Sequence, residues 1–161
     1  MVPKAELHCH IEGAAAPELV IEQARRYNAS VEPFIRDGSF VWHDFTSFLA
    51  AYDFAAGLFR TEEDYARLAE HYLTGLARDG AIYSEVFTSP DHALKAGLSP
   101  QAYTDALGEG IGRAKAATGI EGRMIVTGVR HFGVESIEAA ARFAATCSHP
   151  LVTGFGVAGE E

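Results

Sequence analysis

Strand-like and helix-like segments alternate along almost the whole chain, and this alternation is the feature that most restricts the possible folds. Four short apolar segments read as strands, at about 5–11, 81–87, 122–129 and 151–159. Longer segments with helical spacing of apolar residues lie between them, at about 17–27, 61–79, 99–118 and 135–147. Strands and helices in this order pair the strands in parallel through right-handed crossovers, so we predict an α/β protein with a parallel sheet.

Polar residues gather where the predicted strands end, and this helps to choose between parallel α/β folds. They are His8 to Glu12, Glu85, Arg130–His131 and Gly159–Glu160. No glycine-rich phosphate motif opens a helix, which argues against a nucleotide-binding doubly wound sheet. Functional groups at the carboxyl ends of strands are typical of a (β/α)8 barrel, but that fold takes eight strands and about 250 residues. We therefore predict the first half of a TIM-type (β/α)8 barrel.

The whole chain, 1–161, is interpreted as the N-terminal portion of a single barrel whose C-terminal half is absent. An aromatic-rich stretch at 31–60 has partial helical spacing, interrupted by Gly38 and Gly57, and predicts short helices. The next helix begins after Thr61, a typical helix-capping residue. Together these segments predict a helical insertion at 31–80 after the first strand.

The overall composition limits the partners and the location of the protein. The net charge of −9 and the hydrophobic share of 48% fit a globular protein that lacks the clustered Lys and Arg of nucleic-acid binders. We find neither a signal peptide nor an apolar run of about 20 residues. Two isolated cysteines, Cys9 and Cys147, do not indicate a disulfide framework. We expect a cytoplasmic protein that binds neither nucleic acid nor a membrane.

The first predicted strand carries a His-X-His pair that suits a metal ion. His8 and His10 are two residues apart, so their side chains share one face of the strand. Two imidazoles placed in this way can converge on one ion, and zinc is the common metal that they suit best. A bare His-X-His pattern is more often a pair of surface histidines, but Glu6 and Glu12 on the same face favour a functional site. Cys9 points to the opposite face and is interpreted as a small buried hydrophobe.

The remaining histidines carry a weaker signal. His131 ends a predicted strand, and the pattern fits a place at the site and a place outside it equally well. The others lie on predicted helices or turns and are interpreted as core or solvated residues: His43, His71, His92 and His149. The aromatic stretch is interpreted as a packed cap, because the chain lacks the positive charge of a base-stacking platform for nucleic acid.

Several motifs together resemble one enzyme family. The opening "PKAELHCHIEG" is similar to the Pro-Lys-X-Glu-Leu-His-X-His-hydrophobic-(Asp/Glu)-Gly opening of the adenosine/adenine deaminase family, within the amidohydrolase superfamily. The likeness continues through "EVFTSP", the "RH" after the third predicted strand, and "GFGVAGEE". The motifs occur in the family's order over essentially the whole chain, which resembles the N-terminal half of the family's barrel.

This resemblance implies a zinc-dependent hydrolase that converts adenosine to inosine and ammonia, with one zinc ion and a bound water. His8 and His10 would be zinc ligands. His10, Glu12 and Gly159 would contact the substrate, a small purine nucleoside or base, with Glu12 at the ribose position and Gly159 against the purine ring. The family's third zinc His, its general-acid Glu, a further His and an Asp are expected beyond residue 161. We therefore expect no complete catalytic set, and no activity, in this chain alone.

One departure from the family pattern keeps a second substrate open. Adenosine deaminases usually carry Asp where this chain has Glu12, and the longer acid occupies part of the ribose space. Glu at this position is similar to what adenine deaminases of the family show, so deamination of the free base to hypoxanthine is the alternative. Another aminopurine deaminase, or a non-enzymatic purine binder with the same fold, also fits these residues.

Overall fold

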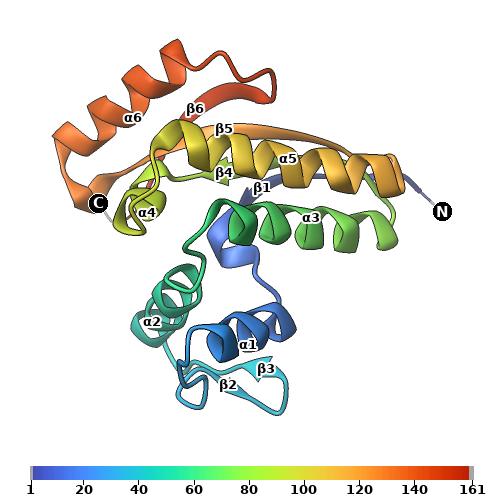
Figure 1. Cartoon of the computed structure of the whole chain (residues 1–161), viewed down its shortest axis with the longest axis vertical. Coiled ribbons are helices and arrows are strands. Elements are labelled where there is room, and N and C mark those ends of the chain that lie inside the picture. The colour runs from blue at the N-terminus through green and yellow to red at the C-terminus, as the bar shows by residue number, and fades with distance from the viewer. Residues whose placement is uncertain (1, 160–161) are drawn as a thin grey trace.

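The computed structural model describes residues 2–159, so Glu160 and Glu161 of the last motif lie outside the described residues. Its main sheet is entirely parallel, with the strand order β1-β4-β5-β6. The strands are β1 (Lys4–His10), β4 (Ala81–Thr88), β5 (Glu121–Val129) and β6 (Val152–Ala158). Figure 1 shows the curved sheet packed among its connecting helices. All four strands coincide with the predicted segments, and β1 and β6 form the two edges of the sheet.

Three crossover helices lie where apolar residues recur at helical spacing: α3 (Glu62–Arg78), α5 (Pro100–Thr118) and α6 (Val134–Thr146), with a short 3-10 turn η2 (Arg130–Phe132) before α6. A further short helix, α4 (Pro90–Lys95), follows β4 in a segment where no helix was predicted. Thr61 caps α3 in a capping box with Asp64, as its sequence predicts. α3 and α5 run side by side in Figure 1, and their buried residues share one core with the sheet and with the segment between β1 and α3. No helix within residues 2–159 is long and apolar enough to cross a membrane.

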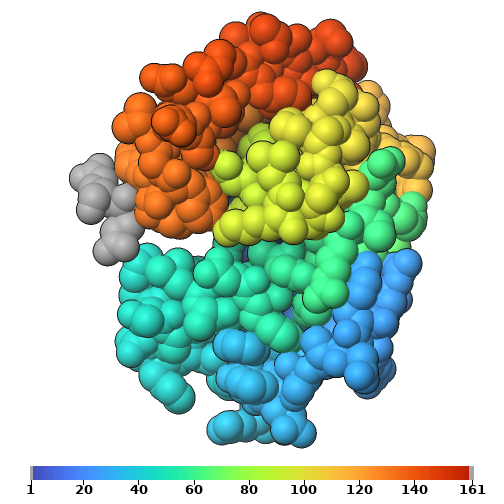
Figure 2. All heavy atoms as spheres, turned by 60° about the vertical axis from the view of Figure 1, so that its left-hand side comes forward, coloured from blue at the N-terminus to red at the C-terminus, as the bar shows by residue number. Residues whose placement is uncertain are grey.

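The segment between β1 and α3 forms a separate lobe. It consists of η1 (Ile11–Ala14), α1 (Pro17–Arg26), β2 (Ile35–Arg36), β3 (Ser39–Phe40) and α2 (Phe45–Ala56). Its β2–β3 hairpin, which the sequence analysis did not predict, turns at Asp37 and Gly38, both with positive φ. An Asp-Gly pair of this kind favours a tight hairpin turn. In Figure 2 the lobe, coloured blue to teal, adjoins the yellow-green and orange elements along one boundary.

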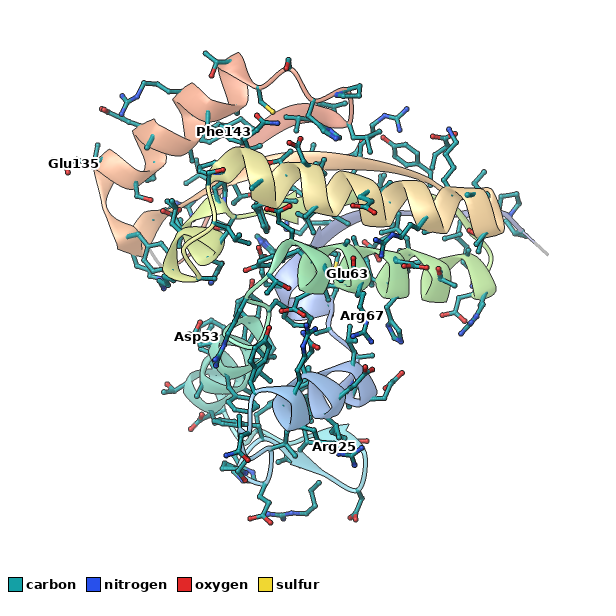
Figure 3. All side chains as sticks on the ribbon, in the orientation of Figure 1. Arg25, Asp53, Glu63, Arg67, Glu135 and Phe143 are labelled. Atoms are coloured by element: carbon teal, nitrogen blue, oxygen red, sulfur yellow. The ribbon has the colours of Figure 1, made fainter. Side chains whose placement is uncertain are left out.

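A buried carboxylate fastens this lobe to the barrel helices. Asp64, in the first turn of α3, has a side chain with no exposure to solvent. It accepts hydrogen bonds from Arg26 Nη1 at 2.8 Å and from Tyr27 Oη at 2.5 Å. The backbone N–H groups of Arg60 and Thr61 add two more bonds, each at 3.1 Å. Figure 3 shows Arg67 between α3 and α1, where it pairs with Glu22 of α1 at 2.8 Å.

Gly110 allows α3 and α5 to approach closely. A Cβ at this position would lie 2.1 Å from the backbone oxygen of Ala66. Because a backbone atom cannot move aside without shifting its helix, we expect Gly110→Ala to lower the free energy of unfolding by about 3 kcal/mol. Urea unfolding of the protein expressed from the complete gene measures this change. Gly112→Ala is the matched control, since nothing lies within 4 Å of its Cβ position and alanine favours the helix. Equal stability of the two variants would contradict the close approach.

Candidate functional site

The two histidines of the opening motif lie at the carboxyl end of β1. Their ring centroids are 5.7 Å apart. The ring of Phe87, near the end of the adjacent strand β4, lies 4.3 Å from the ring of His8 and 5.3 Å from that of His10. The pairing of His10 with Phe87 in the β1–β4 register explains this contact. The strand geometry therefore brings both predicted zinc ligands together on one face, as the His-X-His spacing predicts.

The geometry of this pair fits a shared metal ion. A zinc ion bound through a ring nitrogen lies about 3.2 Å from the ring centroid, so two rings bound to one tetrahedral ion have centroids about 5.2 Å apart. The observed separation of 5.7 Å is close to that value. Burial lowers the pKa of His10, the charges of His8 and His92 lower it further, and Glu12 opposes them. A lowered pKa favours the neutral imidazole, which is the form that binds metal.

Two imidazoles are an incomplete zinc site. Within residues 2–159, no group of three or more His, Cys, Asp or Glu side chains is placed to hold a metal ion. Cys9, between the two histidines, is half-buried, and burial raises the pKa of its thiol, while a hydrogen bond with Tyr72 lowers it. Tyr72 belongs to α3. The contact with Tyr72 indicates that Cys9 faces the outer helix layer, as the alternation along the strand predicts.

Glu12 has a more enclosed position than its motif alone indicates. It lies in η1, directly after β1, and is 0% exposed. Its Oε1 accepts a short hydrogen bond from the hydroxyl of Tyr103, at the start of α5. The backbone N–H of Ser89, after β4, lies 3.4 Å from the same oxygen. The other oxygen, Oε2, has no hydrogen-bond partner among the described residues.

Gly159 follows β6, at the edge of the sheet opposite to β1 and its histidine pair. The strand order places β4 and β5 between β1 and the end of β6. Its φ of +95° suits glycine, and a Cβ would meet Nδ1 of His131 at 2.8 Å. Arg130 Nη1 donates to the Gly159 carbonyl at 3.0 Å. His131 therefore contacts the predicted substrate residue Gly159, while the structure shows no direct contact between Gly159 and the two histidines.

Sequence reasoning missed three residues that shape this site. Phe87 occupies the position two after Glu85 on the same strand, so the alternation of "EVF" could have identified it as facing the histidines. Ser89 lies within the "TSP" motif, but its contact with Glu12 depends on strand register. Tyr103 reads as an ordinary core residue of its helix, and nothing in its local pattern indicates a contact with Glu12.

Known proteins match this chain over almost its whole length. A family model described as adenosine deaminase matches residues 3–161. The chain belongs to the adenosine deaminase family. An adenine deaminase of Mesorhizobium japonicum is 84% identical to this family member over 158 residues, which are 98% of this chain and 49% of that relative. The resemblance drawn from the sequence motifs is thus confirmed.

Solved structures show the same fold. An adenine deaminase from Arthrobacter aurescens matches with a TM-score of 0.83 at 24% identity, over 100% of this chain and 50% of that one. An amidohydrolase from Burkholderia ambifaria, solved with bound Zn, matches with a TM-score of 0.80 at 22% identity, over 99% of this chain and 45% of that one. These matches confirm the predicted fold, the first half of a TIM-type barrel.

The comparisons also bear on the extent and the substrate of this deaminase-family chain. It spans about half the length of the curated relatives that it matches. Those relatives are named adenine deaminases, which favours the adenine alternative over the adenosine that the motif resemblance first implied. A hydrolytic deaminase family and a barrel fold are therefore established for the chain.

Proposed function

We propose that the protein to which this chain belongs is a zinc-dependent adenine deaminase, which converts the free base to hypoxanthine and ammonia. The observation that carries the proposal is the pair of imidazoles on one face at the end of β1, with ring centroids 5.7 Å apart. The 84% identity to a relative named adenine deaminase supports the choice of substrate. Cytoplasmic location stays a prediction from the composition.

In this proposal some residues of the chain bind the metal ion and others bind the substrate. His8 and His10 would hold the zinc ion. When bound, zinc supplies Lewis-acid chemistry, lowering the pKa of a water toward about 7 so that hydroxide is available at neutral pH. Glu12 and Gly159 bind the purine together with His10. A glycine suits contact with a flat ring because its backbone can approach the ring without a side chain between them.

Phe87 has a supporting role in the same proposal. Its ring lies against both imidazoles, so it restricts their rotation. The residues that complete the zinc shell and transfer protons are expected beyond residue 161, as the family resemblance implies. The chain's own contribution is therefore to place two metal ligands and part of the purine pocket.

A direct assay tests this function. The protein expressed from the complete gene and loaded with zinc is expected to deaminate adenine, with ammonia released in equal amount to hypoxanthine. We expect kcat/KM for adenosine to be at least about 100-fold lower, because the sugar has to enter space that the longer Glu12 side chain occupies. Product chromatography with both substrates measures the ratio. Faster turnover of adenosine than of adenine would contradict the proposal.

A further inference from the structure

Glu12 has an uneven set of hydrogen bonds for a buried carboxylate. Oε1 accepts a hydrogen bond from the hydroxyl of Tyr103 and faces the N–H of Ser89, whereas no donor among the described residues meets Oε2 at full hydrogen-bond geometry. An unpaired buried oxygen of this kind destabilises the folded protein, and it does so more strongly when it is charged. It therefore needs a physical explanation, and a donor from a bound ligand would supply one.

The tyrosine that holds Oε1 is itself rigidly placed. Ser99 caps α5 by accepting from the N–H of Ala102 at 3.1 Å, and Pro100 begins the helix, so the first turn has a fixed direction. Tyr103 follows in that turn and is completely buried. Its ring packs edge to face against the ring of Tyr65 of α3, with centroids 4.8 Å apart. The hydroxyl cannot leave Glu12 without disturbing the contact between α3 and α5.

The remaining neighbour of Glu12 comes from the lobe. The ring of Tyr52, on α2, covers the turn that follows Glu12, since a Cβ on Gly13 would lie 2.5 Å from it. Burial raises the pKa of Tyr52, and the charge of Glu12 and a hydrogen bond with its carboxylate raise it further. The Tyr52 hydroxyl therefore lies within weak hydrogen-bonding range of Glu12, but no donor among the described residues meets Oε2 at full hydrogen-bond geometry.

We propose that Tyr103 is a positioning residue, whose hydroxyl holds Oε1 of Glu12 so that Oε2 accepts a hydrogen bond from a ring N–H of a free purine base. A free base carries a hydrogen on a nitrogen of its five-membered ring, whereas a nucleoside carries its sugar there. The inference rests on the proposed function and extends it, because it assigns base recognition to a residue 91 positions away from Glu12.

The test compares two tyrosine variants of the zinc-loaded protein expressed from the complete gene. Tyr103→Phe removes one hydroxyl and keeps the ring, so the carboxylate loses its fixed orientation. We expect KM for adenine to rise about 10-fold or more, with zinc content unchanged and kcat changed less than KM, as for loss of a hydrogen bond to a charged group. Tyr65→Phe is the matched control, because its buried hydroxyl has no hydrogen-bond partner, and its KM should stay within about twofold.

Two outcomes would overturn the inference. One is a Tyr103→Phe protein with lower thermal stability but unchanged KM, which would make the hydroxyl merely structural. The other is an equal rise in KM for both tyrosine variants. If Tyr103→Phe does not fold, Glu12→Gln replaces it as the test, since the amide can keep an oxygen for Tyr103 while its NH2 faces the ligand N–H. An unchanged KM in Glu12→Gln would also overturn the inference.

The same experiment separates this inference from the proposed function. A wild-type protein that deaminates adenine, together with a Tyr103→Phe variant of unchanged KM, contradicts the role of Tyr103 and leaves the function intact. A wild-type protein that does not act on adenine contradicts the proposed function, and this inference with it.

Discussion

His10→Ala in the protein expressed from the complete gene is expected to abolish zinc binding and to lower kcat/KM for adenine by roughly 1,000-fold or more. A catalytic zinc ion commonly has three protein ligands, so loss of one imidazole removes a large part of its binding free energy. The activation of water is lost with the ion, and the uncatalysed barrier returns. Elemental analysis for zinc and a rate assay on the same sample measure both effects.

A distant histidine provides the control for this prediction. His71 lies on α3, where it is paired with Glu18 at 3.7 Å and is partly exposed. His71→Ala should keep the zinc content and the rate of the wild type. His8→Ala should behave as His10→Ala does, because the two rings share one face of β1. Full zinc occupancy in His10→Ala would contradict the assignment of the site.

Asp64→Asn is expected to lower the free energy of unfolding at neutral pH by about 3 kcal/mol, because it removes a fully buried charge that four donors share. Burial alone would raise the pKa of Asp64, but hydrogen bonds led by that of Tyr27 hold it below its ordinary value. A carboxylate whose pKa is lower in the folded protein adds stability above its unfolded pKa, about 4. That stability is lost as the pH falls through the folded pKa.

The pH dependence of the free energy of unfolding is therefore the most specific test of this prediction. The difference between wild type and Asp64→Asn should be constant from about pH 7 to pH 5 and should shrink below about pH 4. Urea unfolding of zinc-free protein at each pH excludes a contribution from metal release. Glu63→Gln serves as the control, since Glu63, which is next to Asp64 on α3, forms an exposed pair with Arg113 of α5 and its substitution should change stability little. A difference that persists in acid would contradict the role given to the Asp64 charge.

Much of the fold was predictable because its determinants are local. The alternation of "AELHCHI" and the helical spacing after Thr61 are each set by neighbours in the sequence, and both elements occur where they were predicted. The His-X-His pair was predictable for the same reason, since a strand places residues two apart on one face. The β2–β3 hairpin carried its own Asp-Gly signal at Asp37, but the surrounding aromatic residues dominated the interpretation of that stretch.

The enclosed surroundings of Glu12 were not predictable from the sequence, for a physical reason. Its partner Tyr103 is 91 residues away, and their contact depends on how α5 packs against α3 and on where β4 ends. Phe87 meets the histidines only because the β1–β4 register places it opposite His10. Packing and register arise from the summed contacts of whole elements, so no short motif contains them.

The order of the strands also has a consequence for handling this chain alone. β1 and β6 are the margins of the sheet, and within residues 2–159 no strand pairs with their outer backbone N–H and C=O groups. Apolar side chains remain exposed on the same strands, with Leu7 at 55% and Phe155 at 41%. Exposed edge strands of this kind can pair with strands of other molecules. A polypeptide of this length expressed by itself is therefore expected to self-associate through intermolecular β-pairing, which size-exclusion chromatography would reveal.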